Sequence, residues 1–427
     1  MPSLAKRTAW LECRQCGRQF GLLAMFEGCP DCAAGMMSPL EVNYDYDAFD
    51  GDALIAEWKE RPPGLWSYHE FLPLADPRQA VTLCEGRTPL VRLDVPGPGR
   101  IWLKDESRNP TGAHKDRFHS VSVSMARTLG LKKITAATTG NHGVSAAAYA
   151  ARAGLSSLIF CDPEAPDVLQ DLIQLYGGRV VLLRDRQAFL ARLVRDFGWY
   201  PSTGLTPMPV GTPYGVEGYK SIAYEIYFQL GAKLPARVIV PVASGDVLYG
   251  PWKGFRELAR LTGAADAALP RMVVAQSSGC DPIVTGFRAG EHQVPVHPNP
   301  QTVARSIGDA TAAPITLSTL YESKGGAEAV SDADILATVT LLARRAGIAA
   351  EPSAAAAVAA ALQMQARGEI GDDEDVVCIV TGGAAKWPDT IKRSVEPHLI
   401  AESDKAALEG WIIAADRDIG AASAKTA

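Results

Sequence analysis

From residue 100 onward, short apolar runs alternate with alanine-rich stretches whose apolar residues recur at helical spacing. Such runs are typical of strands buried on both faces of a parallel sheet, and the helices between them cover those faces. The pattern predicts an α/β fold with mainly parallel sheets. We expect strands at 101–103, 133–137, 157–161, 180–183, 238–242, 272–275 and 376–380, and helices at 145–153, 219–230, 248–261 and 354–366.

Composition divides the remaining chain. Two closely spaced pairs of cysteines mark residues 1–40, and a polar, aromatic stretch at 41–83 predicts a helical and extended arm, so that 41–99 comprise the arm and the start of the catalytic body. The arm leads into a predicted catalytic body at 100–400, which includes a smaller α/β subdomain at about 128–215. We interpret residues 401–427 as a tail, a short helix followed by frayed residues.

The chain has 427 residues, of which 47% are hydrophobic, and a formal net charge of -6. These values are typical of a globular protein with two or three domains. The acidity argues against a nucleic-acid partner and against an anionic membrane surface. No apolar stretch has the length of a membrane span, and the first residues lack the apolar core of a signal peptide, so we expect a cytoplasmic protein.

Four of the eight cysteines, Cys13, Cys16, Cys29 and Cys32, form two CxxC pairs. Two such pairs can supply four thiolates to one tetrahedral metal, which predicts a structural zinc ribbon. The alternatives are a pair of disulfides or reduced thiols without a metal, although a reducing cytoplasm disfavours disulfides. The remaining cysteines lie singly in apolar surroundings and are interpreted as core residues: Cys84, Cys161, Cys280 and Cys378.

One lysine, Lys115, lies in the run NPTGAHKDRF at 109–118, where an apolar segment gives way to a helical pattern. A lysine held there can form a Schiff base with an aldehyde cofactor. The reaction requires neighbouring groups that lower the lysine pKa and position the aldehyde, because a solvated ammonium is not a nucleophile.

Three strand-to-loop junctions carry polar, glycine-rich sequence, and open parallel sheets bind ligands at such junctions. In TTGNHG at 138–143, Asn141 can contact a ring hydroxyl. In PVASGDVLYG at 241–250, the amides of Ser244, Gly245 and Asp246 can cradle a phosphate, although Asp246 can equally be a helix cap. In VTGGAAKWPD at 380–389, Thr381 can face a ring nitrogen. Each junction taken alone is also compatible with a plain turn.

Taken together, these motifs resemble the threonine-synthase-like branch of the fold-type-II pyridoxal-phosphate enzymes, from the cysteine pairs to Asp389. The most specific likeness is LKDESRNPTGAHKDR at 103–117. The resemblance implies two open twisted α/β domains after a zinc ribbon, pyridoxal phosphate as cofactor, and Lys115 as the Schiff-base lysine. It also implies cofactor contacts from Asn141, Ser244, Gly245, Asp246 and Thr381, and a homodimer. We expect Thr138, Thr139 and His142 to contact a small amino-acid substrate.

The substrate stays open because the chain departs from the family pattern. Gly215 stands where threonine synthases commonly have an arginine that clamps the substrate phosphate. Replacement donors are expected among His142, Lys220, Lys253 and Arg305. Threonine synthesis from phosphohomoserine is the specific prediction. The alternatives are β-replacement or β-elimination, as in a cysteate synthase or a serine/threonine dehydratase, and a zinc-ribbon protein that only binds a ligand.

Other polar residues are interpreted without a catalytic role. His119 is expected on the exposed side of its helix, whereas His114, directly before the lysine, can pack near the cofactor. Glu217 and Glu351 are interpreted as helix caps.

Overall fold

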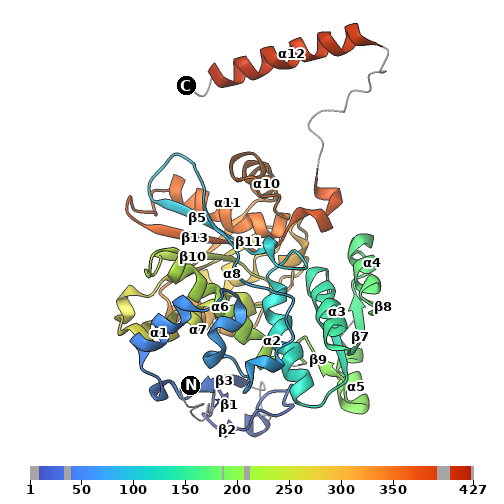
Figure 1. Ribbon diagram of the computed structural model, residues 1–427, viewed down its shortest axis with the longest axis vertical. Coiled ribbons are helices and arrows are strands. Elements are labelled where there is room, and N and C mark those ends of the chain that lie inside the picture. Colours follow the sequence, from blue (N-terminus) through green and yellow to red (C-terminus); the bar gives the residue numbers. More distant parts are fainter. Residues whose placement is uncertain (1–8, 33–39, 185–186, 206–211, 392–403, 425–427) are drawn as a thin grey trace. The chain divides into compact units, whose positions relative to one another are not determined.

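The computed structural model describes residues 9–32, 40–184, 187–205, 212–391 and 404–424 (Figure 1). Two compact units, 1–390 and 391–427, divide the chain. Within the described residues of the first unit, the strands form three sheets. None of the described helices is both long and apolar enough to cross a membrane.

The largest sheet has six strands in the order β12-β11-β10-β13-β5-β4. Five strands run parallel, and the edge strand β4 is antiparallel to β5. The strands are β4 Leu90–Arg92, β5 Arg100–Asp105, β10 Arg237–Pro241, β11 Arg271–Ser277, β12 Gly326–Val330 and β13 Asp375–Val380. Because helices cover both faces, a central strand such as β13 is apolar throughout after its first residue, Asp375.

Alternate residues of the central strands face two different cores. Val238 and Val240 of β10 pack with α6 and α7, whereas Ile239 packs with α11. The helices around this sheet are α1 Gly51–Glu60, α2 Lys115–Thr128, α6 Pro213–Gln229, α7 Asp246–Thr262, α8 Pro282–Arg288, α9 Ile315–Glu322, α10 Asp332–Ala346 and α11 Pro352–Ala366.

A second sheet has four parallel strands in the order β8-β7-β6-β9. Its strands are β6 Lys133–Thr138, β7 Ser156–Cys161, β8 Arg179–Leu182 and β9 Tyr200–Pro201, and its helices are α3 Asn141–Ala153, α4 Asp167–Leu175 and α5 Gln187–Phe197. The helix α2 packs against both α3 and α6 and therefore lies between the two parallel sheets.

A small antiparallel sheet near the N-terminus has the order β2-β1-β3 and consists of β1 Ala9–Cys13, β2 Gln19–Phe20 and β3 Leu40–Tyr44. Its side chains are part of the main core, because Leu11 and Val42 are fully buried there together with Trp58 and Phe71 of the following segment. Residues 41–83 are helical and extended, and much of the segment is buried.

All seven predicted strands and four predicted helices are present. All four helices begin earlier than the apolar pattern indicated, at Asn141, Pro213, Asp246 and Pro352. The polar residues predicted as loops therefore form first helical turns, where amides without an intrahelical partner can donate hydrogen bonds to polar neighbours. Among the predicted core cysteines, Cys161, Cys280 and Cys378 are buried, whereas the prediction for Cys84 is wrong because it is exposed.

The second unit contains α12, Lys405–Ala424. This helix has 20 residues, so the tail is more helical than the short helix predicted. The expected frayed end at 425–427 lies outside the described residues.

Candidate functional site

A cavity of about 280 Å³ lies where the carboxyl ends of β6, β10 and β13 meet. Ligands bind at this edge of open parallel sheets because the following loops diverge there. The cavity brings together every residue predicted to be catalytic, cofactor-binding or substrate-binding: Lys115, Thr138, Thr139, Asn141, His142, Ser244, Gly245, Asp246 and Thr381. Their individual roles stay predictions.

Lys115 is the first residue of α2 and is half-buried in the cavity wall. Its Nζ lies 5.9 Å from the centre of the Tyr219 ring. Burial lowers the pKa of Lys115, and the carboxylates of Asp246, Asp309 and Glu351 partly oppose that shift. A lysine with a lowered pKa is more often neutral and can act as a nucleophile or a base.

Asn141 opens α3 and is buried. Its Nδ2 donates a hydrogen bond of 2.8 Å to Oε2 of Glu351, whereas its buried Oδ1 has no hydrogen-bond partner. Glu351 does occupy the N-cap position of α11, but its carboxylate makes no cap hydrogen bond and contacts Asn141 instead. The unpartnered oxygen of Asn141 fits a ligand hydroxyl that donates to it.

The loop before α7 forms a narrow cradle. Gly245 has a φ of +124°, and a Cβ there would lie 2.5 Å from Cγ2 of Thr316. The Ser244 hydroxyl donates to Asp309 at 3.0 Å, and Asp246 is the first helical residue rather than the cap. The amides can receive an anion at this helix start, but three carboxylates, of Asp246, Asp309 and Glu351, line the same cavity.

Three histidines surround Lys115. His114 and His142 line the cavity, where a ring nitrogen of each bonds a backbone carbonyl, of Thr381 at 3.0 Å and of Ser202 at 2.9 Å. The expectation that His119 is exposed is wrong, because α2 is enclosed and His119 is fully buried. Burial first, and then Lys115, lowers the pKa of His142 to about 3.

Most of the expected replacement phosphate donors do not line the cavity. Lys220 and Lys253 are buried and both bind Glu217 at 2.7 Å, so Glu217 is a buried ion-pair partner rather than a helix cap. Arg305 is exposed and donates to the Glu164 carbonyl. Gly215 packs so closely that a Cβ there would lie 2.3 Å from Cζ of Phe118, so no arginine fits this position.

Several lining residues escaped the sequence analysis: Arg184, Ser202, Thr203, Ser306 and Asp309. Ser202 and Thr203 follow β9, which has only two residues and leaves no periodic signal. Ser306 and Asp309 lie in a loop without a preceding strand, and the buried Oγ of Ser306 has no hydrogen-bond partner. With Lys115, Arg184 supplies the positive charge of the lining, and its side chain is 75% exposed at the rim.

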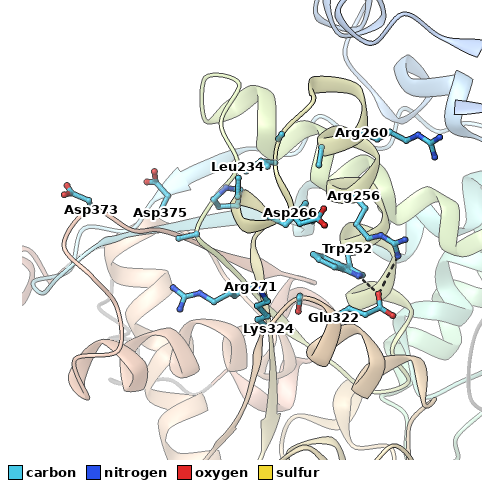
Figure 2. A pocket seen from close by; sticks show the side chains of 17 residues that line it. Leu234, Trp252, Arg256, Arg260, Asp266, Arg271, Glu322, Lys324, Asp373 and Asp375 are labelled. Carbon is cyan, nitrogen blue, oxygen red and sulfur yellow. Dashed lines mark hydrogen bonds and ion pairs between the residues drawn. The ribbon is translucent and has the colours of Figure 1, made fainter. Parts of the chain in front are cut away.

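A larger cavity, of about 910 Å³, lies at the opposite, amino ends of β10, β11 and β13 (Figure 2). Its charged side chains largely pair with protein groups. Glu322 accepts a hydrogen bond from Trp252 and lies 3.6 Å from Arg256, and Asp375 binds Arg100 at 2.7 Å. The smaller cavity with Lys115 is therefore the candidate active site.

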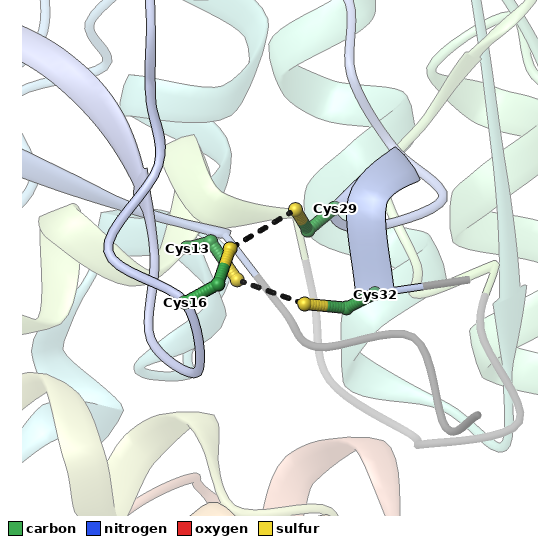
Figure 3. Close-up of side chains that lie close together, drawn as sticks. All are labelled: Cys13, Cys16, Cys29 and Cys32. Carbon is green, nitrogen blue, oxygen red and sulfur yellow. Dashed lines mark hydrogen bonds between the residues drawn. The ribbon is translucent and has the colours of Figure 1, made fainter. Parts of the chain in front are cut away.

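The four N-terminal cysteines converge (Figure 3). Their Sγ atoms all lie within 4.8 Å of one another, and the pairs Cys13–Cys32 and Cys16–Cys29 are each 3.8 Å apart. A disulfide would need about 2.05 Å. Gly17 and Gly28 have φ values of +70° and +94°, which suit the tight turns that direct both thiols of a CxxC pair inward.

Comparison with known proteins defines the class. The family of pyridoxal-phosphate dependent enzymes matches residues 81–382. Threonine synthase of Methanocaldococcus jannaschii is 36% identical over 93% of this chain and 98% of its own length. Threonine synthase of Methanosarcina acetivorans is 35% identical over 92% of this chain and 96% of its own length. The chain belongs to the pyridoxal-phosphate dependent enzymes and, among them, to the threonine-synthase-like family.

Solved structures confirm the fold. An L-serine ammonia-lyase from Rhizomucor miehei superimposes with a TM-score of 0.59 at 23% identity, over 71% of this chain and 95% of that chain. A threonine deaminase from Solanum lycopersicum gives 0.58 at 21% identity, over 70% and 88%. The prediction of a fold-type-II α/β enzyme is therefore confirmed.

The geometry of the cavity fits pyridoxal phosphate, independently of these similarities. The unpartnered Oδ1 of Asn141 suits the ring hydroxyl, and the cradle at Gly245 suits the phosphate. Asn141 would therefore accept from the hydroxyl through Oδ1, since its Nδ2 already binds Glu351. Lys115 and Thr381 line the same cavity.

Proposed function

We propose that the protein is a threonine synthase that converts O-phosphohomoserine and water to L-threonine and phosphate. The observation that carries the proposal is the end-to-end similarity to threonine synthases, which spans 93% of this chain. The cavity around Lys115 supports it, because the reaction needs a base that can remove a proton and return one elsewhere on the same small molecule.

Pyridoxal phosphate, when bound, draws electrons from the amino acid attached to it and so acidifies the hydrogens near that attachment. Lys115 would hold the cofactor and then take up and return protons at Nζ, which its lowered pKa favours. Asn141, the cradle from Ser244 to Asp246, and Thr381 would orient the cofactor. Thr138, Thr139 and His142 would contact the substrate, and the neutral ring of His142 can donate or accept without adding charge.

The substrate phosphate needs a cationic partner, and we propose Arg184 for that role. Arg184 lies at the cavity rim, bound at 2.8 Å to the exposed Glu164, which a phosphate can replace. The substitution Arg184→Ala is expected to raise KM for phosphohomoserine at least about tenfold, since a charge-assisted hydrogen bond contributes about 1.5–3 kcal/mol. The matched control is Arg192→Ala, which removes an exposed arginine of α5 that lies outside the cavity lining.

A second candidate function is β-elimination from serine or threonine. It is favoured by the three carboxylates that line the cavity, from Asp246, Asp309 and Glu351, because they repel a phosphorylated substrate but tolerate a neutral hydroxyl. The solved relatives add nothing to this choice, since their low identity reports the fold alone.

One experiment separates the two functions. The purified holoenzyme is mixed in parallel with phosphohomoserine, phosphoserine, serine and threonine, while the visible spectrum, phosphate and keto-acid release are followed. Threonine synthase predicts equal amounts of phosphate and threonine from phosphohomoserine. Keto acid from serine or threonine, with no spectral change on adding phosphohomoserine, would reject it in favour of elimination. Lys115→Ala should abolish the cofactor band of the free enzyme.

We also propose that the four cysteines bind structural zinc and that the enzyme is a cytoplasmic homodimer. A Zn–S bond of about 2.3 Å places the sulfur atoms of a tetrahedral site about 3.8 Å apart. The closest Sγ pairs match that edge length at 3.8 Å. Sedimentation of the holoenzyme tests the dimer, and a monomer at micromolar concentration would reject it.

A further inference from the structure

A chain of buried polar groups leads from the cavity wall into the protein behind Lys115. Ser202 Oγ lies 2.7 Å from Nε2 of His119, and Nδ1 of His119 lies 3.0 Å from Oγ of Ser145. Ser145 donates to Oδ1 of Asp116 at 2.6 Å. These four side chains come from α2, α3 and the residue after β9, so the chain joins elements of both parallel sheets around the cavity.

The direction of each hydrogen bond follows from the groups that can only accept, the Asp116 carboxylate and the Lys115 carbonyl. Asp116 as a carboxylate can only accept, so the Ser145 hydroxyl donates to it and must accept from His119 Nδ1. The same Nδ1 also lies 3.0 Å from the backbone carbonyl of Lys115, which again can only accept. The proton of neutral His119 is therefore on Nδ1, and the unprotonated Nε2 accepts the Ser202 hydroxyl.

The surroundings of these hydrogen-bonded side chains keep the His119 imidazole neutral. Asp116 is the group among them that can take up a proton. Burial, and next the adjacent His142, holds the pKa of His119 well below its ordinary value, with Lys115 and His114 acting in the same direction. Burial raises the pKa of Asp116 to about 6, although hydrogen bonds from Ser145 and Thr111 and the charge of Lys386 oppose the rise.

Besides Lys386, two tyrosine phenols face Asp116. The hydroxyls of Tyr149 and Tyr219 are buried near it, and burial first raises the pKa of both, so they stay neutral. The Lys386 ammonium is held near Asp116 by a hydrogen bond of 2.6 Å that it donates to the Thr111 carbonyl. Asp116 is thus the group of this cluster that changes its charge near neutral pH.

We propose that Ser202 is a further catalytic residue, which accepts a proton from the attacking water while His119, Ser145 and Asp116 carry its own proton away. The inference rests on the proposed function, in which water supplies the β-hydroxyl of threonine. As the water oxygen bonds to the β-carbon, the substrate's double bond to that carbon opens and its electron pair moves to the α-carbon, where Lys115 returns a proton. At the same time the O–H bond of the water breaks and a new O–H bond forms on Ser202. The Ser202 proton moves to His119 Nε2, the Nδ1 proton to Ser145, and the Ser145 proton to Asp116.

After the proton transfers, all four side chains are uncharged. Ser202, His119 and Ser145 each gain one proton and lose one, and Asp116 ends as the uncharged acid. No imidazolium has to persist in a site where burial disfavours it. Lys115 is left free for the protons on the α-carbon side, so the reaction has two acid–base groups instead of one.

The first test does not depend on activity. The protein without cofactor is labelled with ¹⁵N-histidine, and the signal of His119, one of 7 histidines, is assigned from its absence in His119→Asn. At pH 7 we expect a protonated Nδ1 and an unprotonated Nε2, with both shifts moving as Asp116 titrates near pH 6. A protonated Nε2 at pH 7 overturns the proposal, because Ser202 then has no base.

The second test uses the holoenzyme with phosphohomoserine. Ser202→Ala and His119→Asn are each expected to lower kcat about 100-fold while KM changes less than twofold, as for loss of a general base. The asparagine amide at position 119 can replace the Nδ1–H donor of His119 toward Ser145, but it has no atom in place of Nε2, which accepts from Ser202. The matched control is Ser122→Ala, a buried serine of α2 that bonds Tyr200 outside the relay, and it should keep kcat.

The pH profile separates a proton relay from a structural role. Wild-type kcat should fall as pH drops through about 6, where Asp116 takes up its proton, and this step should vanish in both variants. An unchanged step, or an unchanged kcat in Ser202→Ala with its cofactor spectrum retained, overturns the proposal. If wild type forms no threonine, the proposed function fails instead, and the NMR result still decides whether the relay exists.

Discussion

Asp246 places a carboxylate at the first helical turn of α7, where the predicted cradle would receive the cofactor phosphate. Two unit charges 4 Å apart interact with about 4 kcal/mol at an effective dielectric constant of 20. Lys115 offsets part of the negative charge of Asp246 and Asp309. We therefore expect the predicted cradle to bind a phosphate more weakly than its amides alone would.

We expect Asp246→Asn to tighten the binding of pyridoxal phosphate about tenfold, which corresponds to about 1.4 kcal/mol. The dissociation constant is measured by titrating cofactor-free protein and following absorbance. Asp266→Asn makes the same charge change in the other cavity and should leave the constant unchanged. Weaker binding in Asp246→Asn would mean that the carboxylate holds the loop in shape rather than repelling the phosphate.

At the residue scale, the sequence indicated Lys115 by its own motif, and Asn141 and Thr381 by their places after the apolar strands β6 and β13. It missed Ser202 and Asp309, whose preceding segments are a two-residue strand and a loop. It also misjudged His119, because helical periodicity in α2 does not reveal that neighbouring helices enclose the whole helix.

At the scale of elements, the antiparallel sheet β2-β1-β3 is joined to the rest of the chain through its core residues, whereas the cysteine cluster links β1 to residues 29–32 of the same N-terminal segment. The CxxC spacing was sufficient to predict the cluster, because it places both thiols of a pair at one tight turn. The burial of β1 and β3 against α6 and α7 could not be predicted, since it depends on which surfaces meet.

We expect one zinc per chain, and Cys29→Ser should lose it and lower the unfolding midpoint. Serine is a poor zinc ligand, and metal binding contributes directly to the folding of such small sheets. Metal analysis under reducing conditions and thermal unfolding measure the two effects. Cys84→Ser, which changes an exposed cysteine outside the cluster, should keep both the zinc and the midpoint. Full zinc content in Cys29→Ser would contradict the site.

At the scale of the whole molecule, a buried ion network holds the main body together. Arg117 is fully buried and binds Glu106 and Glu225, each at 2.7 Å, while Lys104 binds the same Glu225 at 2.6 Å. The network joins β5 and the residue after it to α6 through Arg117, the third residue of the helix α2 that begins with Lys115. It thereby positions the start of α2 relative to the six-stranded sheet.

We expect Glu225→Gln to destabilise the protein by about 3–5 kcal/mol, because it leaves buried cations without their partner. Burial would raise the pKa of Glu225, but Arg117 and Lys104 outweigh it and hold that pKa well below its ordinary value. A lowered pKa stabilises the folded state above about pH 4.3 and loses this effect as pH falls further. Urea unfolding should therefore show a difference that shrinks in acid.

The control for this prediction is Arg78→Ala, which removes an exposed ion pair with Asp76. Its unfolding midpoint should match that of wild type, because exposed pairs are well screened by solvent. A Glu225→Gln protein as stable as this control would show that Gln229 and Thr88, which also bind Lys104, are sufficient partners.

The sequence by itself determined the α/β class, the order of the strands along the chain, the cysteine cluster and the lysine with its strand-end partners. These features are local, since periodicity and short motifs depend on residues close together in the chain. Only the tertiary structure decided which side chains share a cavity and which lysines are buried in ion pairs with glutamates. It also decided that Ser202 and Asp116 belong to one series of hydrogen-bonded side chains. Burial, and the pKa values and partners that follow from it, are set by contacts between distant segments, and those contacts have no signature in a single stretch of sequence.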